Sequence, residues 1–286
     1  MIAHVAEAGE DRGRVVVRLG TPAAASKAAL AAAVHVARAF QSEIEAIFIE
    51  DPEIHAAAHH DKVRLLSATG RPRALTRSTL ASSITHFATA ATREVAECAS
   101  GADVAFNSQV VRGDTITALS AACAERGPWN IVAFAEAITS AGRAEVLNAA
   151  LTRVWGTTAF IAAGPTAVWR KGPIVAVIED IERLTGFVRA AERLAAVTRD
   201  EVLLLPAAGD EIAQDWLDSE IRLTLQPGAR TRLLERPKLG GGAGVRSEIE
   251  LLAPRLVLAR HGGLAIPAIR TEHALSHLSA PAFILH

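Results

Sequence analysis

The stretch Arg14-Val-Val-Val-Arg-Leu-Gly-Thr-Pro22 decides the fold of this chain, because strand-forming residues pass directly into helix-start residues. The valines favour a β-strand, and Gly20 is expected to end it. Thr21 is a suitable N-cap and Pro22 a suitable first helical residue, so a helix should follow. The run EIEAIFIE at residues 43–50 predicts a second strand. Strand, helix and strand in this order predict a parallel pair with a right-handed connection.

The same alternation of strands and helices continues after a polar, His-rich segment at residues 51–71. Apolar positions repeat with the helical period at residues 80–98, 116–125 and 143–154, and short apolar runs predict strands at 103–111, 130–135 and 158–162. This first half therefore reads as one α/β unit with five strands.

The pattern then begins again at Ile174, so the chain contains an internal repeat. The first strands of the two halves are offset by 160 residues, but the fourth and fifth by 125 and 123, so about 35 residues are missing between the second and fourth strands of the second half. There the sequence IRLTLQPGARTRLLE (residues 221–235) predicts a hairpin around Pro227-Gly228. We expect domains at residues 12–165 and 172–286, the second diverged.

Composition excludes several classes of protein. Thirty basic and 31 acidic residues give a formal charge of -1, which disfavours binding to nucleic acid or to an anionic membrane. We see neither a signal peptide nor an apolar run long enough to span a membrane. The only cysteines, Cys98 and Cys123, fall in helical patterns typical of small buried residues. We therefore expect a cytoplasmic protein.

The run VVRGDTITALSAACAERGPWNIVAFA at residues 110–135 resembles the universal stress protein family. In that family a strand ends in Gly-Asp or Gly-Asn, an Ile- and Ala-bearing helix follows, and the fourth strand is of Leu-Ile-Val type. Gly113-Asp114 and Ile131-Val132 stand in those places, and the second half echoes them at residues 244–258 and 281–284. The resemblance covers nearly the whole chain as two tandem copies.

This resemblance implies two tandem Rossmann-like domains of the adenine nucleotide alpha hydrolase-like type. Each should hold a five-stranded, mainly parallel sheet, and the two should pack as a pseudo-dimer equivalent to the family's homodimer. Whether edge strands pair between the halves stays open.

The departures from the family's ATP motif imply degenerate nucleotide-binding sites. ATP-binding members carry Gly-x2-Gly-x9-Gly-Ser/Thr after the fourth strand, where glycines let the backbone close around phosphates. In the first half Ala135 and Ile138 replace the first two glycines, and Glu136 adds a negative charge where phosphates would lie. The family's aspartate after the first strand is matched only in the second half, by Asp180.

Any small-molecule site should lie at the carboxyl ends of the strands. The candidate ligand-binding residues are Gly20, Thr21, Gly113, Asp114, Asp180, Gly242, Gly244, Arg246 and His261. Turn and helix-cap chemistry explains the same Gly, Thr and Asp residues without a ligand. The run Gly240 to Gly244 could cradle an anion through its amides or form a mobile loop.

Neither a catalytic motif nor a metal site is recognisable. His55 and His59, followed by His60 and Asp61, and separately His273 and His277 beside Glu272, have the i, i+4 spacing of two ligands on one helix face. Neither pair has a third ligand that the sequence can place, so both are expected on solvated faces.

Our leading hypothesis is a non-catalytic stress-response or regulatory module with a largely decayed ATP site and no cofactor. The alternative is a sensor of a small ligand or a nucleotide such as ATP or AMP, or an enzyme, that uses the second-half loops. A third hypothesis is a structural pseudo-dimer that recruits a protein through residues 51–101. A protein partner or self-association is compatible with each.

Overall fold

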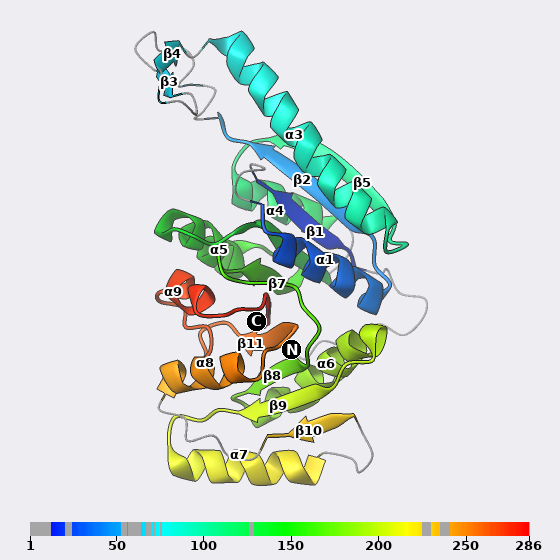
Figure 1. Cartoon of the computed structure of the whole chain (residues 1–286), viewed down its shortest axis with the longest axis vertical. Coiled ribbons are helices and arrows are strands. Elements are labelled where there is room, and N and C mark those ends of the chain that lie inside the picture. The colour runs from blue at the N-terminus through cyan, green and yellow to red at the C-terminus, as the bar shows by residue number, and fades with distance from the viewer. Residues whose placement is uncertain are drawn as a thin grey trace.

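The computed structural model describes residues 13–20, 25–52, 56, 64–66, 70, 72–74, 76–125, 129–224, 230–234 and 241–285. Within these ranges, ten strands form one sheet in the order β10-β9-β8-β11-β12-β7-β6-β1-β2-β5. Helices cover both faces of the sheet along its length, which gives a three-layer α/β structure (Figure 1).

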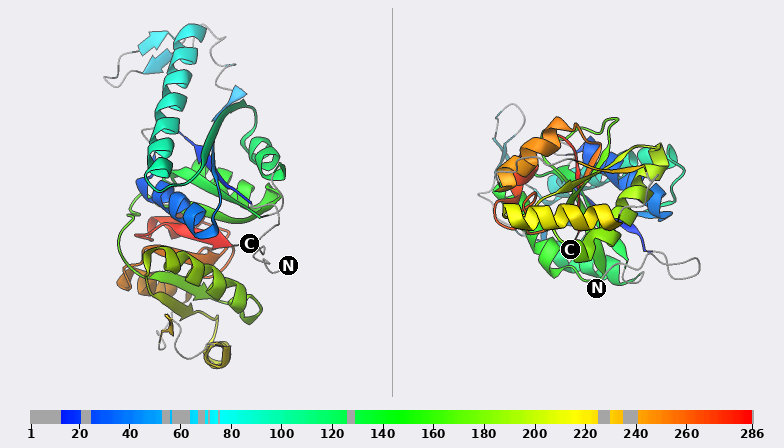
Figure 2. Two further views of the ribbon diagram at one scale, coloured as in Figure 1. Left: turned by 90° about the vertical axis from the view of Figure 1, so that its right-hand side faces the viewer. Right: turned by 90° about the horizontal axis from the view of Figure 1, so that it is seen from below.

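The first half contributes five strands that are all parallel to their neighbours within the half. The strands are β1 (Val15–Leu19), β2 (Ile44–Glu50), β5 (Phe106–Arg112), β6 (Asn130–Ala137) and β7 (Thr157–Ala163), and the helices are α1 (Lys27–Phe40), α3 (Arg77–Ser100), α4 (Thr115–Ala124) and α5 (Ala141–Arg153). A separate antiparallel pair, β3 (Arg64–Leu66) and β4 (Pro72–Ala74), lies beside the projecting start of α3 (Figure 2).

The second half repeats the five-stranded parallel arrangement. Its strands are β8 (Ile174–Ile178), β9 (Val202–Pro206), β10 (Thr231–Leu233), β11 (Leu256–Arg260) and β12 (Ala282–Leu285), and its helices are η2 (Ile181–Arg183), α6 (Leu184–Thr198), α7 (Glu211–Thr224), α8 (Gly241–Leu251) and α9 (Thr271–Ser276). The prediction that each half contains five parallel strands is therefore confirmed.

The two halves share one continuous sheet, because β7 and β12 pair in antiparallel orientation. Phe283 of β12 lies opposite Ile161 of β7, and both side chains are buried. The edge pairing that the sequence left open thus occurs within a single chain, and the halves do not keep separate sheets.

Helices α1 and α6 strengthen this joint on one face of the sheet. The Nε2 atom of the buried His35 lies 2.9 Å from the carbonyl oxygen of Leu194, and the guanidinium of Arg193 donates to the carbonyl of Ala39 at 2.8 Å. The His35 ring also packs against Trp169, with ring centroids 5.2 Å apart. Burial lowers the pKa of His35 to about 4, so this histidine is neutral at physiological pH.

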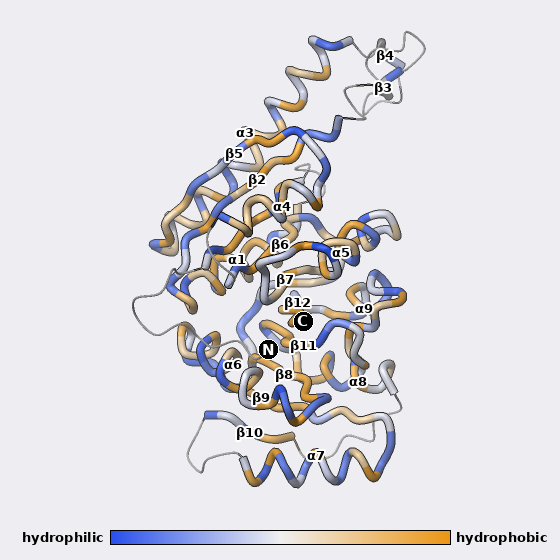
Figure 3. Tube along the Cα trace, turned by 180° about the vertical axis from the view of Figure 1, so that it is seen from behind, coloured by the Kyte–Doolittle hydropathy of each residue, from blue (hydrophilic) through white to orange (hydrophobic). Residues whose placement is uncertain are grey.

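The core follows from the apolar character of the strands. Apart from β5, β10 and the strand ends, the sheet strands are buried, as expected for a parallel sheet covered on both faces. Figure 3 shows the resulting hydrophobic band through the middle of the molecule. One apolar cluster joins the sheet to α1, α3, α6 and α7, and the other joins it to α4, α5, α8 and α9.

Two predictions of local structure were wrong. Helix α1 begins at Lys27 with Ser26 as its N-cap, not at Thr21, because the Ser26 hydroxyl accepts the Ala29 amide at 3.2 Å. The expected hairpin is also absent among the described residues: residues 221–224 belong to α7, and β10 runs parallel to β9. Ile221 is buried while Leu223 is exposed, so their alternation reflects a helix that is apolar on two faces. Pro227-Gly228 lies outside the described residues.

Candidate functional site

Each half has a topological switch point, where neighbouring strands connect in opposite directions along the sheet. It falls between β1 and β6 in the first half and between β8 and β11 in the second. In open parallel sheets the crevice at the carboxyl ends of such strands is the usual place for a ligand. These two places are therefore the candidate sites.

The first switch point is filled by Glu136 of β6. A β-carbon added to Gly20, which follows β1, would lie 1.8 Å from the carboxyl carbon of Glu136. The Glu136 carboxylate accepts a hydrogen bond from Arg18 at 2.9 Å, and its side chain is only 10% exposed. The carboxylate is thus held over Gly20 by an ion pair, in the space that a ligand at this crevice would use.

Backbone contacts close the same crevice. The amide of Ser26 donates to the carbonyl of Ala135 at 2.7 Å, and Ala25 forms an isolated antiparallel bridge with Glu136. The residues that lead into α1 are therefore hydrogen-bonded to the end of β6.

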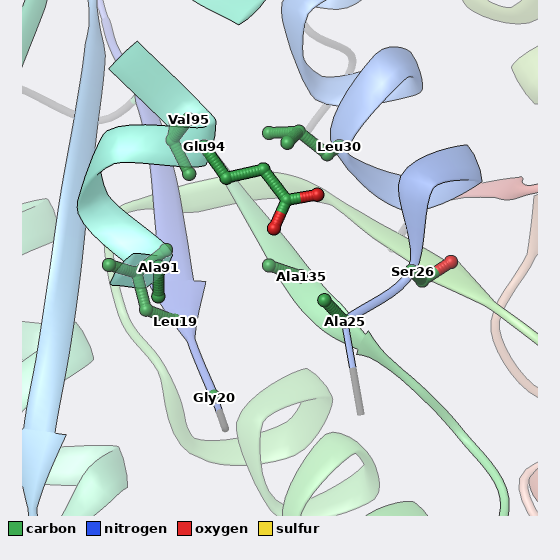
Figure 4. Close-up of a pocket in the computed structure, with 9 residues that line it drawn as sticks. All are labelled: Leu19, Gly20, Ala25, Ser26, Leu30, Ala91, Glu94, Val95 and Ala135. Carbon is green, nitrogen blue, oxygen red and sulfur yellow. The ribbon is translucent and has the colours of Figure 1, made fainter. Parts of the chain in front are cut away.

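A small cavity of about 20 Å³ remains beside this closure. A space of this size holds roughly one water molecule. Its lining includes Leu19, Gly20, Ser26, Ala135 and Glu94. Figure 4 shows that Glu94 of α3 points its carboxylate into the space near the start of α1. A second acidic group therefore faces the N-terminus of α1, where an anionic ligand would otherwise be favoured.

The second switch point is also filled by a glutamate, here Glu179 after β8. One oxygen of Glu179 accepts the amides of Leu264 at 2.8 Å and Ala265 at 3.3 Å. A β-carbon on Gly263 would lie 2.0 Å from the other oxygen. Burial raises the pKa of Glu179, and the two backbone hydrogen bonds oppose that rise. The loop after β11 is thereby tied to the end of β8.

Asp180 lies beside Glu179 at a cavity of about 10 Å³ that Arg183 and Arg260 also line. The Asp180 carboxylate accepts the amide of Glu182 at 3.0 Å and lies 3.8 Å from Nε of Arg183. Its contacts are those of a cap on the short helix η2, which is the alternative that the sequence left open for this residue.

In the first half, Asp114 likewise serves as a helix cap. Its carboxylate accepts the backbone amide of Thr117 at 2.9 Å and the Thr117 hydroxyl at 3.0 Å, and these bonds lower its pKa. Gly113 precedes it with a φ of +154°, and a β-carbon added there would meet no atom within 4 Å. The pair supports α4 rather than either glutamate-filled crevice.

The expected loop at Gly240 to Gly244 is wrong in its described part. Residues 241–244 form the first turn of α8, and Gly240 lies outside the described residues. A β-carbon on Gly242 would lie 2.5 Å from the carbonyl oxygen of Leu264, so this glycine allows close packing of the helix. Arg246 donates to the same carbonyl at 3.2 Å, and burial lowers its pKa. Gly242 and Arg246 thus contact the same loop that Glu179 binds.

The histidines do not assemble a site in the described chain. The amide of His261 donates to the carbonyl of Leu285 at 3.0 Å, and His261 bridges Ile266. The rings of His273 and His277 meet edge to face with centroids 4.5 Å apart. Within the described residues there is no group of three or more His, Cys, Asp or Glu that could hold a metal. Thr21 and His55, His59, His60 and Asp61 lie outside those residues.

Sequence reasoning noticed Glu136 and placed Glu179, together with Asp180, at a strand end where a ligand could bind, but it missed Arg18 and Glu94. The only available signal for Glu179 was its place directly after β8, next to Asp180. Glu94 lies on a helix whose packing against α1 could not be deduced from periodicity. Its position in the first crevice is therefore a tertiary result.

Strand order and two switch points define a duplicated Rossmann-like α/β fold. A universal stress protein from Archaeoglobus fulgidus is similar in structure, with a TM-score of 0.57 and 12% identity over 96% of this chain and 97% of that one. A functionally unknown protein from Pseudomonas aeruginosa gives a TM-score of 0.54 and 13% identity over 96% and 92% of the chains. No family model and no curated protein matches. The chain thus has the fold of universal stress proteins, as the resemblance predicted.

In the described part of the chain, no helix is both long enough and apolar enough to span a membrane. Cys98 and Cys123 are free thiols, Cys98 exposed and Cys123 buried. Burial raises the pKa of Cys123 to about 12, so its thiol is protonated at physiological pH.

Proposed function

We propose that this chain is a non-catalytic stress-response or regulatory module whose two nucleotide sites are occupied by its own carboxylates. The observation that carries the proposal is the pair of filled switch points, with Glu136 over Gly20 and Glu179 against Gly263. The stress-related role is carried over from the universal stress protein that shares its fold.

Charge supports the exclusion of nucleotide from the first half. A triphosphate at this crevice would lie near the carboxylates of Glu136 and Glu94, and like charges at short range repel strongly where water is scarce. Arg18 does not compensate, because it already pairs with Glu136. Ligand pockets for small molecules usually measure about 300–1,000 Å³, far more than the space found here.

The second half also favours a module without a nucleotide site over the alternative of a sensor or an enzyme. Among the described residues, Asp180, Arg246 and His261 have separate local roles. Asp180 caps η2, Arg246 holds the carbonyl of Leu264, and His261 continues the backbone pairing of β11. We therefore propose no catalytic residue and no nucleotide cofactor. The described free cysteines are compatible with the cytoplasm, which is the compartment we propose.

Calorimetric and thermal-shift titrations with ATP, ADP and AMP, each with and without Mg²⁺, test the proposal. A universal stress protein that binds ATP serves as the positive control. We expect no saturable heat and no rise in Tm for the wild-type chain. A saturable rise in Tm that Asp180→Ala abolishes would overturn the proposal in favour of a nucleotide sensor. The stress-related part is tested separately, by whether the protein becomes more abundant when its host cells stop growing.

A further inference from the structure

Helix α7 carries an apolar stripe on the side that faces away from the sheet. Ile212 is 84% exposed, Trp216 is 53% exposed and Leu223 is 79% exposed. Together with Ser219 they have the spacing four, three, four, which places them on one face of the helix as in a heptad seam. A clustered apolar stripe of this kind is more informative than single exposed side chains, because clustering marks interaction surfaces.

The opposite side of α7 is firmly anchored. Leu217 and Ile221 are buried in the core, and the Gln214 side chain donates to the carbonyl of Pro206 at 3.0 Å while accepting the amide of Ala208 at 2.8 Å. The helix therefore cannot turn its apolar stripe inward. Viewed from below, α7 lies across the end of the molecule nearest the viewer, with its outer side uncovered by other drawn elements (Figure 2).

We propose that this face of α7 binds the same face of α7 in a second copy of the chain, in an antiparallel arrangement with twofold symmetry. A twofold axis midway between residues 217 and 218 sets Ile212 opposite Leu223 of the second copy. The same axis sets the large Trp216 opposite the small Ser219 of the second copy, so the stripe is complementary to itself in size.

Charge favours the same pairing. Asp215 and Arg222 flank the stripe on one side, both exposed, and the axis brings Asp215 of each copy near Arg222 of the other. Two equivalent ion pairs thus border the apolar contact. The other charged residues around the stripe, Asp210, Glu211 and Glu220, are acidic. This balance argues against an anionic membrane as the occupant, because interfacial helices are rich in Lys and Arg on their polar face.

The contact should be weak, since one pair of 14-residue helices is a small interface. Sedimentation equilibrium of the full chain is the test, and we expect a reversible monomer–dimer equilibrium with Kd between micromolar and millimolar. Trp216→Ala should raise Kd roughly tenfold, as expected for an aromatic anchor at the centre of an interface. Trp155→Ala is the matched control, because Trp155 is 83% exposed at another place and should leave Kd unchanged.

Exchanging the charges of Asp215 and Arg222 tests this particular antiparallel geometry. Asp215→Arg or Arg222→Asp alone should each raise Kd about tenfold, because both equivalent pairs become repulsive. The double variant D215R/R222D should restore the wild-type value. Circular dichroism checks that each variant is folded. A chain that stays monomeric at about 0.5 mM, a Kd that none of these variants changes, or a double variant as weak as the single ones would each overturn the proposal.

Discussion

The carboxyl group of Glu136 occupies the position from which a side chain at Gly20 would have to start. A β-carbon on Gly20 would lie 1.8 Å from the carboxyl carbon, and one on Gly263 would lie 2.0 Å from an oxygen of Glu179. In the first half the glycine follows the first strand and the glutamate lies on the fourth. In the second half these positions are exchanged. The two halves therefore fill their crevices with glutamates at the ends of different strands. The internal repeat alone does not explain why both crevices are filled.

Gly20→Ala should destabilise the protein by about 1–3 kcal/mol, because the new methyl group overpacks the site and displaces Glu136 from Arg18. Urea unfolding at pH 7 measures this change. Gly142→Ala in α5 is the control, since no atom would lie within 4 Å of its β-carbon. The control should be neutral or stabilising by up to about 1 kcal/mol. Equal losses for both variants would contradict the close approach of Glu136.

Glu136→Ala should cost about 2 kcal/mol of unfolding free energy, because it leaves the largely buried Arg18 without its carboxylate. Glu136→Gln should cost less, since an amide oxygen can still accept from the guanidinium. Glu97→Ala provides the comparison: its pair with Arg93 is exposed on both sides and should contribute less than about 0.5 kcal/mol. A Glu136→Ala protein as stable as Glu97→Ala would show that the Arg18–Glu136 pair contributes no more to stability than an exposed pair.

His35 predicts a dependence of stability on pH. Its pKa in the folded protein is about 4, below the ordinary value of 6.5, so the unfolded chain binds the proton more readily between these values. The stability of the native state should therefore fall as the pH decreases from 6.5 towards 4, by a total of about 3 kcal/mol from this group.

The measurement is urea unfolding of the wild type and of His35→Gln at pH 7 and pH 5. Glutamine keeps a donor for the carbonyl of Leu194 but does not titrate, so the difference between the two proteins isolates His35 from the acidic residues. The loss between pH 7 and pH 5 should be smaller in the variant. An identical loss in both proteins would disprove the role of this histidine.

Asp114→Ala should lower the unfolding free energy by about 1 kcal/mol through loss of the N-cap of α4. Asp114→Ser should retain most of the stability, because a hydroxyl can accept the same Thr117 amide. Thermal unfolding of the three proteins provides the test. If serine were as damaging as alanine, capping would not explain this residue.

Much of the fold could be predicted from local patterns. The valines of β1, the EIEAIFIE run and the later apolar runs predicted the five strands of the first half, and the recurrence at Ile174 predicted the repeat. The five parallel strands of the second half were implied by the family resemblance, since the local pattern predicted a hairpin in place of α7 and β10. Helix α7 was missed because Ile221 and Leu223 alternate as in a strand, although they lie on opposite faces of a helix. The sequence does not reveal which side of α7 packs against the core. It therefore could not predict that Leu217 is buried and Trp216 exposed.

The candidate site was less accessible to sequence reasoning. Missing glycines and the charge of Glu136 indicated a poor phosphate site, but Glu94 reaches the first crevice from α3, and the amides that bind Glu179 come from a loop 85 residues further along the chain. Asp114 and Asp180 showed the right residue type at strand ends, where a cap and a ligand contact have the same sequence signature.

By itself the sequence determined the order of the sheet strands and main helices in the first half, the duplication and the absence of the glycines that an ATP loop needs, because these depend on short-range periodicity and residue type. Only the tertiary structure decided that β7 and β12 join the halves into one sheet and that glutamates fill both switch points. Those outcomes depend on which distant segments meet, and burial and hydrogen bonding select such contacts only after the whole chain has packed.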